Sequence, residues 1–381
     1  MNWTEEQALA INQEGSNIIV SAGAGSGKTA VLSERVLRKL KEGVDIRKIL
    51  MLTFTNEAAG EMAMRIRKKI KKAGLKDQLE YINSAYITTF DAYALSIVKK
   101  YHYLLGLPKQ IKIIDSSIIL LEKKKILEDI FKTYYENKDK RFLKLIGDFT
   151  NRDDSSIMAS ILSINDSLNL KYDKEEYLEK YIPNFYNSEN INKLFIEYFN
   201  YLKNLAEILE EDIYAIESFM EEKDYLKLYE AVNKLFKPNE YNDLHSHNNL
   251  KLPAFRNLDE EGTSLKENIK NTFTEIIELT YYSEEELKKQ LESTKDYVSI
   301  IIDIIKELEE KLDLYKYKNG AFEFVDIAKM AIKIVYTFDS VRDELKYYFN
   351  EIMIDEYQDT SDLQEIFIKA IANNNVYMVG D

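Results

Sequence analysis

The sequence predicts an α/β fold in which a parallel sheet is interrupted by a long helical segment. Short apolar runs alternate with amphipathic helical patterns near both ends of the chain, and the middle shows helical periodicity alone. Such alternation is typical of a parallel, doubly wound sheet, because parallel strands need crossover connections. Strands are expected at residues 18–20, 49–54, 85–90, 111–114, 351–354 and 375–379, and helices at 30–40, 57–72, 91–103 and 322–335.

The first elements are marked by capping residues. Thr4 precedes Glu5, Glu6 and an apolar stretch, which is the pattern of a helix N-cap. The apolar run 18–20 reads as a short buried strand that enters a glycine-rich turn. Thr55 stands where it can cap the helix at 57–72.

The middle of the chain predicts helices only. Between residues 117 and 318 apolar side chains recur three and four positions apart. The polar stretch 242–263 interrupts this pattern and is expected to be a mobile loop. One α/β domain, made of residues 1–117 and 321–381, is therefore expected to be split by a helical insertion at 118–320, with the first boundary between 100 and 118.

Composition limits the functions that the chain can have. The 381 residues suffice for about two domains. The absence of cysteine excludes disulfides, thiolate metal sites and cysteine nucleophiles. No apolar run approaches the roughly 18 residues of a membrane helix, and Met1–Glu6 is unlike a signal peptide, so a cytoplasmic protein without a membrane partner is expected. The pair His245 and His247 reads as part of a solvated loop rather than a metal site, because no cysteine lies near it.

Charge is distributed unevenly. The net charge of −14 argues against nucleic acid, but residues 1–130 carry 21 Lys and Arg against 15 Asp and Glu, which leaves 31 against 51 for the rest. Positive charge is densest in the run 65–72. That run is either a solvated helix face or a phosphate contact.

A glycine-rich turn followed by a helix predicts a nucleotide site. The turn comprises Ala22, Gly23, Ala24, Gly25, Ser26, Gly27, Lys28 and Thr29. Glycines let backbone N–H groups surround an anion, and the helix N-terminus adds partial positive charge. Lys28 would reach the β- and γ-phosphates of ATP, and the Thr29 hydroxyl would bind Mg²⁺. Ala22 stands where the usual pattern has Gly. A plain flexible turn is disfavoured by the Gly-Lys-Thr ending and the strand before it.

A second apolar run, Ile352–Ile354, ends in two acids. In phosphate-loop enzymes a neighbouring strand supplies an aspartate for Mg²⁺, here Asp355. Glu356 could then orient and deprotonate the attacking water. The alternative, that these acids only begin a loop, is disfavoured by the presence of the glycine-rich turn.

Six segments resemble motifs of the UvrD/Rep-like superfamily 1 DNA helicases. They are the Q motif at 3–7, motif I at 22–29, motif Ia at 52–59, motif Ib at 88–93, motif II at 355–364 and the opening of motif III at 379–381. Within that group the chain is most similar to the AddA family of helicase–nuclease subunits, on the Trp3-Thr4 opening, residues 111–115 and the long helical segment that contains 152–154.

The resemblance implies an architecture. It implies a RecA-like phosphate-loop sheet, domain 1A, interrupted by a large all-helical insertion, domain 1B. A second RecA-like domain and any nuclease domain would lie outside this sequence. The chain is then expected to be an N-terminal fragment that binds nucleotide weakly and turns it over poorly.

The resemblance also assigns roles at matching positions. Gln7 would hydrogen-bond the adenine edge, and Arg35 would lie near the base. The catalytic residues would be Lys28, Asp355, Glu356 and Gln358. Single-stranded DNA would contact Phe54, Thr55, Asn56 and Thr89.

Two of these positions need comment. Phe54 is a candidate stacking platform, and base stacking contributes about 1–3 kcal/mol per base; without the resemblance it would read as a core residue of its strand. Asp91 stands where many family members have His. An acid repels phosphate, so Asp91 is not expected to contact the DNA backbone.

The predicted function is that of an ATP- and DNA-binding fragment of a helicase acting in double-strand-break repair. Its partners would be single-stranded or duplex-end DNA and an AddB-like nuclease subunit. The alternatives are a repair helicase fragment without nuclease and a non-catalytic DNA-binding module. An unrelated phosphate-loop ATPase or kinase is disfavoured by Thr53–Ala59 and by Gln358–Thr360.

Overall fold

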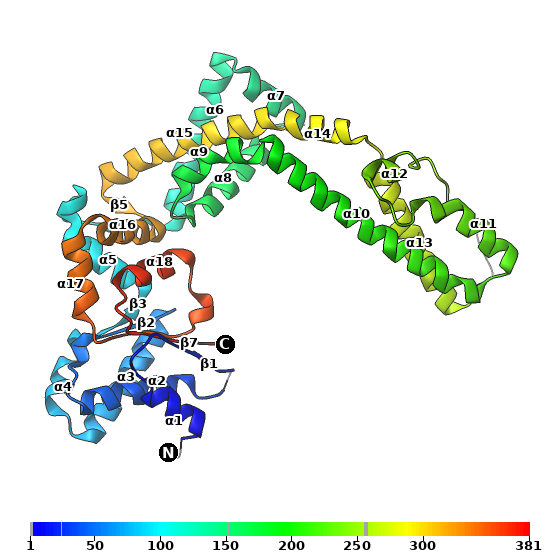
Figure 1. The fold of residues 1–381 in the computed structure, drawn as a ribbon. Coiled ribbons are helices and arrows are strands. Elements are labelled where there is room, and N and C mark those ends of the chain that lie inside the picture. The colour runs from blue at the N-terminus through cyan, green and yellow to red at the C-terminus, as the bar shows by residue number, and fades with distance from the viewer. Residues whose placement is uncertain (1–2, 24, 151, 255–257) are drawn as a thin grey trace. The chain divides into compact units, whose positions relative to one another are not determined.

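The α/β part of the chain is built on one parallel sheet. The computed structural model describes residues 3–23, 25–150, 152–254 and 258–381. Among these, the main sheet has five strands in the order β1-β7-β6-β2-β3, and every pair is parallel. The predicted parallel sheet is therefore confirmed (Figure 1).

The strands are β1 (Ile18–Ser21), β2 (Ile49–Thr53), β3 (Tyr86–Thr89), β4 (Lys112–Ile113), β5 (Ala321–Phe322), β6 (Glu351–Ile354) and β7 (Val376–Gly380). The helices up to the middle are α1 (Glu5–Asn12), α2 (Lys28–Lys41), α3 (Asn56–Ala73), α4 (Lys76–Tyr81), α5 (Phe90–Tyr101), α6 (Ser116–Asn137), α7 (Lys140–Phe149), α8 (Ser155–Asn169) and α9 (Lys174–Phe185). The later helices are α10 (Ser188–Ile216), α11 (Glu222–Val232), α12 (Tyr241–His245), α13 (Glu260–Leu279), α14 (Glu284–Ser293), α15 (Lys295–Asn319), α16 (Phe324–Thr337), α17 (Asp339–Tyr348) and α18 (Asp362–Ile371).

Helices cover both faces of the sheet (Figure 1). Successive side chains of a strand point to opposite faces. In β2, Met51 packs with α2 and α3, whereas Leu50 and Leu52 pack with α5, α16 and α18. β6 follows the same alternation, with Met353 on the first face and Ile352 on the second. The continuous apolar runs thus reflect a sheet that is buried on both sides.

Two strand predictions need correction. β1 is an edge strand among the described residues rather than a fully buried one, and Ile19 is 67% exposed. The run at 111–114 does not join the main sheet. It forms β4, which pairs in parallel with β5 in a separate two-stranded sheet. Both differences depend on which strands become neighbours, a property that local periodicity does not contain.

The helical middle does not form one unit. By contacts, Met1–Glu136, Thr150–Lys174 and Ile304–Asp381 make one compact unit, and Asn137–Phe149 with Glu175–Asp303 make another. This division differs from the predicted ranges. One physical reason is that buried Lys123 of α6 pairs with Glu323, the N-cap of α16, at 3.2 Å. This ion pair ties the start of the helical segment to the α/β elements.

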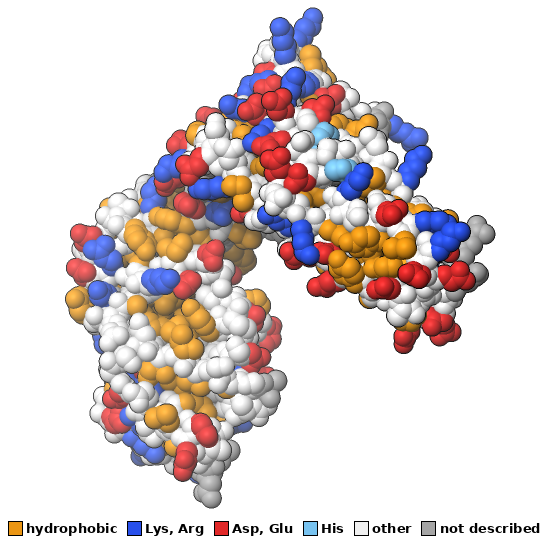
Figure 2. All heavy atoms as spheres, turned by 45° about the vertical axis from the view of Figure 1, so that its right-hand side comes forward, with side chains coloured by type: hydrophobic (Ala, Val, Ile, Leu, Met, Phe, Trp, Pro, Cys, Tyr) orange, Lys and Arg blue, Asp and Glu red, His pale blue; other side chains and the backbone are white. Residues whose placement is uncertain are grey.

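The second unit has its own core. α10 and α13 share an apolar cluster with α11 and α12 that includes Leu209, Leu228 and Ile276. Figure 2 shows acidic and basic side chains interspersed over much of the surface that faces the viewer. The polar stretch 242–263 contains the end of α12 and the start of α13, so part of the predicted loop is helical.

Candidate nucleotide and DNA site

The glycine-rich turn lies between β1 and α2. Gly25 and Gly27 have φ of 80° and 86°, in the left-handed region that glycine adopts without strain. The Ala22 N–H donates to the Gly380 carbonyl at 2.9 Å, and the Ser26 N–H donates to the Gly23 carbonyl at 3.2 Å. These bonds fix the turn against β7 and leave the N-terminus of α2 at its end. Ala24 lies outside the described residues.

Gln7 lies against this turn. Thr4 caps α1, and Gln7 completes the capping box by accepting from the Thr4 N–H at 3.1 Å. Its Nε2 donates to the Ser26 carbonyl at 3.0 Å. The predicted adenine-reading residue is thus held beside the predicted phosphate loop.

Lys28 faces acids from the distant end of the chain. Its Nζ lies 3.4 Å from Glu356 Oε2 and also contacts the Asp381 carboxylate. The hydrogen bond to Asp381, more than the contact with Glu356, raises the pKa of Lys28. Lys28 therefore stays protonated, and an incoming phosphate would compete with carboxylates for the same ammonium group.

Asp355 and Glu356 follow β6 directly. The Asp355 N–H donates to the Leu52 carbonyl at 3.0 Å, which continues the ladder between β6 and β2. Burial, with a smaller contribution from the neighbouring Glu356 charge, raises the pKa of Asp355. Glu356 has φ of 55°, a conformation that a non-glycine residue rarely adopts. Such strain is common at functional sites.

Gln358 connects this turn to the end of β7. Its Nε2 donates to Glu356 Oε2 at 2.8 Å, and its Oε1 accepts from the Asp381 N–H at 3.1 Å. A Cβ at Gly380 would lie 2.6 Å from that same Oε1. Gln358 therefore packs on bare backbone and fixes the carboxylate of Glu356.

The oxygen donors present fit Mg²⁺. Asp355 is partly buried and forms no ion pair within the described part of the chain, and Thr29 lies in the first turn of α2. No group of three or more candidate metal-binding side chains exists among the described residues. That is compatible with Mg²⁺, which usually takes one or two protein ligands together with phosphate oxygens and water.

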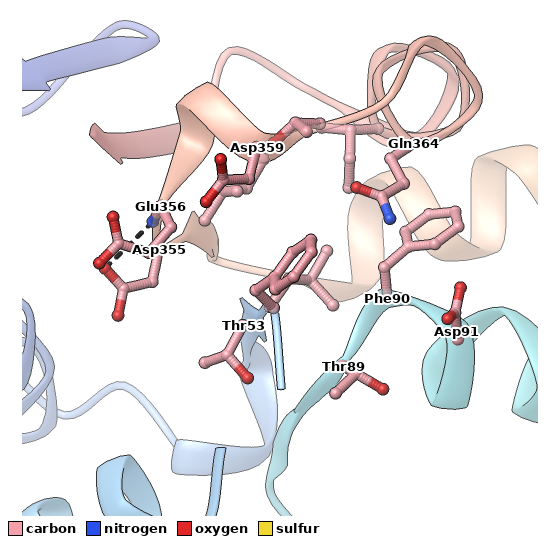
Figure 3. Close-up of a pocket in the computed structure, with 13 residues that line it drawn as sticks. Thr53, Thr89, Phe90, Asp91, Asp355, Glu356, Asp359 and Gln364 are labelled. Atoms are coloured by element: carbon pink, nitrogen blue, oxygen red, sulfur yellow. Dashed lines mark hydrogen bonds between the residues drawn. The ribbon is translucent and has the colours of Figure 1, made fainter. Parts of the chain in front are cut away.

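A pocket opens at the carboxyl ends of β2, β3 and β6. Figure 3 shows Asp355 and Glu356 on one side of it and Thr89, Phe90 and Asp91 on the other. The remaining lining residues are Leu52, Thr53, Phe54, Ile354, Asp359, Thr360, Gln364 and Ile368. The lining contains four carboxylates and no Lys or Arg, so it is unsuited to a phosphate group.

The predicted DNA residues surround this pocket. Phe54 is 63% exposed, which contradicts the interpretation of Phe54 as a core residue. Thr55 and Thr89 accept from the Ala58 and Ala92 N–H groups at 3.1 and 3.2 Å, and so cap α3 and α5. Asn56 begins α3 and is exposed.

Burial also acts on Asp91, the acid at the motif Ib position. It raises the pKa of this carboxyl, which lines the pocket beside Phe90. The placement agrees with the expectation that Asp91 does not contact the DNA backbone.

A family comparison decides what this arrangement belongs to. The family model of the UvrD/REP helicase N-terminal domain matches residues 3–381. The chain belongs to this family.

Relatives with a curated name agree, and each is named as an AddA-type ATP-dependent helicase/nuclease subunit. Over 100% of this chain, the identity is 30% to the protein of Ligilactobacillus salivarius, 30% to that of Clostridium novyi and 28% to that of Listeria monocytogenes. The chain covers 34% of each of these relatives, so it spans about a third of their length. The predicted similarity to the N-terminal part of the AddA family is confirmed.

The structure of this UvrD/REP family chain corrects one site residue. Arg35 is 1% exposed and was predicted to lie near the base. Its guanidinium instead donates to Glu351 and to the carbonyls of Ala10 and Ile11. Its side chain is enclosed between α1 and the sheet and has no surface for a base.

Sequence reasoning missed three residues of the UvrD/REP family site. They are Glu351, the partner of Arg35; Tyr377, whose ring lies under the Arg35 guanidinium; and Asp381, which contacts Lys28. An acid at the start of the apolar run 351–354 was a visible signal, because a buried strand rarely carries an unpaired charge. Tyr377 carried no such signal.

Two predicted features do not bring groups together. His245 and His247 each place Nδ1 against a backbone carbonyl, of Thr280 at 2.9 Å and of Asp243 at 2.7 Å. No helix in the described ranges of the chain is long and apolar enough to span a membrane.

Proposed function

We propose that this chain is the nucleotide-binding and DNA-binding part of an ATP-dependent DNA helicase of the AddA type, with a RecA-like domain 1A and a helical domain 1B. One observation carries the proposal: Lys28 meets Glu356, 328 residues later in the sequence, at 3.4 Å. The glycine-rich turn and the acids that follow β6 thus form one site, although the helical segment separates them in sequence.

Each residue has a role in this proposal. Residues 22–29, including Ala24, enclose the phosphates, Lys28 neutralises them, and Thr29 and Asp355 bind Mg²⁺. Glu356 orients and deprotonates the attacking water, and Gln358 positions that carboxylate. Gln7 hydrogen-bonds the adenine edge. When bound, Mg²⁺ would supply charge neutralisation at the transferred phosphoryl group.

DNA is proposed to cross the pocket rim rather than the acidic pocket floor. Phe54 supports this, because an exposed aromatic ring beside a strand end can stack on a base of any sequence. Thr55, Asn56 and Thr89 present polar groups at two helix N-termini, where phosphate oxygens bind well. The basic run on α3 is partly committed to internal partners, since Arg67 donates to Asn83 and Lys69 pairs with Glu34.

The wider function follows from the names of the relatives. Because those proteins are helicase/nuclease subunits, we propose that the complete protein works in the cytoplasm at DNA ends, in double-strand-break repair with an AddB-like nuclease subunit. Hydrolysis would need groups supplied from outside this chain.

The test is ATP hydrolysis by the complete protein with and without a dT oligonucleotide. We expect DNA to stimulate phosphate release, and Glu356→Gln to slow it by about 10²–10⁴-fold, as expected for loss of a general base, while MgATP still binds. Lys41→Ala, an exposed charge on α2, is the matched control and should behave as wild type. Hydrolysis that is unchanged in Glu356→Gln, or indifferent to DNA, would contradict the proposal.

A further inference from the structure

A buried ion pair lies behind the nucleotide site. Arg35 of α2 and Glu351 of β6 are 1% and 5% exposed. They join through two hydrogen bonds, Nη2 to Oε1 at 2.6 Å and Nε to Oε2 at 3.0 Å. The guanidinium also lies 4.2 Å from the centre of the Tyr377 ring. Its orientation is therefore fixed on two sides.

The remaining face of this guanidinium is turned to α1. Nη1 donates to the carbonyls of Ala10 and Ile11 at 3.0 and 3.1 Å. The Tyr377 hydroxyl donates to the same Ala10 carbonyl at 3.0 Å. These carbonyls lie in the last turn of α1, where helix carbonyls lack partners within the helix.

The bonds matter because α1 is short. It has eight residues, and isolated helices of that length are not stable in water. One helical turn connects the bound end to the site, since Gln7 lies a turn before Ala10 and donates to the Ser26 carbonyl. The position of the Gln7 amide thus depends on how the end of α1 is held.

We propose that Arg35 is a positioning residue for base selection: held by Glu351, it fixes α1 so that Gln7 faces the base of the nucleotide. This inference rests on the proposed function, which supplies the role of Gln7. A direct contact between Arg35 and the base is excluded by its enclosure, and four hydrogen bonds occupy its donors.

The informative variant is Arg35→Lys. Lysine keeps the positive charge beside Glu351 but cannot also donate to two carbonyls of α1. Tyr377→Phe removes only the hydroxyl contact and serves as the milder variant. Arg47→Lys is a matched control, because Arg47 also pairs with a carboxylate, Asp45, and lies 3.9 Å from the centre of a tyrosine ring, but on a segment away from α1.

The measurements are affinities of the chain for ATP, GTP and inorganic triphosphate, each with Mg²⁺, and the amide hydrogen exchange of residues 5–12 without nucleotide. In Arg35→Lys we expect the preference for ATP over GTP to fall by about tenfold, the effect of one lost hydrogen bond to a base edge. Triphosphate affinity should stay within about twofold, because the phosphate loop is intact. Exchange of α1 amides should rise, Tyr377→Phe should lie between, and Arg47→Lys should match wild type.

Three results would overturn the inference. These are an equal loss of ATP, GTP and triphosphate affinity in Arg35→Lys, an unchanged preference in the folded variant, and unchanged exchange of α1. Failure of the proposed function looks different, because ATP would then bind equally well to wild type and Lys28→Ala. In that event the exchange of α1 still decides whether Arg35 holds the helix.

Discussion

Two cations on α2, two turns apart, show how the two ends of one sheet differ. Lys28 lies at the carboxyl end, where its partners are acids of loops and its contact with Glu356 is a long 3.4 Å. Arg35 lies nearer the other end of β6, where Glu351 and two carbonyls of α1 hold it at 2.6–3.1 Å. The same kind of charge is exchangeable at one end and fixed at the other. The site is thus built where partners can be replaced by a ligand.

The largest effect expected from this comparison is on stability at the fixed end. Arg35→Ala leaves Glu351 buried without its main partner, and breaking a buried pair costs about 3–5 kcal/mol of unfolding free energy. Lys39, 3.4 Å from Glu351, favours the lower part of that range. Urea unfolding gives the value. Arg47→Ala removes a more exposed pair and should cost less than about 1 kcal/mol. Equal losses in the two variants would break the comparison.

At the exchangeable end, Phe54→Ala should affect binding rather than folding. Its ring is 63% exposed, so its removal should leave the unfolding midpoint nearly unchanged. Loss of one stacking platform should weaken affinity for single-stranded DNA by about 1–3 kcal/mol. Fluorescence anisotropy with a labelled dT oligonucleotide measures this. A large loss of stability together with unchanged DNA affinity would return Phe54 to the role of a core residue.

The smallest effect is a gain in stability at the site. Because the pKa of Asp355 is raised in the folded chain, its ionisation opposes folding. The free energy of unfolding should therefore fall as the pH rises from the ordinary value of 3.8 through the raised pKa. Asp355→Asn should remove this dependence and add about 0.5–2 kcal/mol at pH 7. Below pH 3.8 the two proteins should converge. Melting curves across pH test this, and a variant less stable than wild type at pH 7 would contradict it.

Local patterns predicted the parts of the site that are continuous in sequence. The turn before Lys28, the apolar run 49–54 and the helix at 57–72 each contain their own signal, because glycine conformation and hydrophobic period are local properties. The acids after β6 were assigned through their place after a strand. The exposure of Phe54 could not be predicted in this way, since its neighbours in sequence are all buried strand residues on one side.

The rest depends on contacts between distant segments. That β1 is an edge strand follows from the order of strands, and that β4 pairs with β5 joins residues more than 200 positions apart. Arg35 was misplaced for the same reason. In sequence it is only a cation on a helix near the phosphate loop. Its partner Glu351 lies 316 residues later and turns it away from the ligand.

The most direct test of the account is a calorimetric titration of MgATP into the chain and into Lys28→Ala. The account predicts that wild type binds one MgATP and that Lys28→Ala loses this binding while its melting temperature stays close to wild type, because the Lys28 contacts are replaceable. MgATP binding that is undiminished in Lys28→Ala would contradict the assignment of the glycine-rich turn as the nucleotide site.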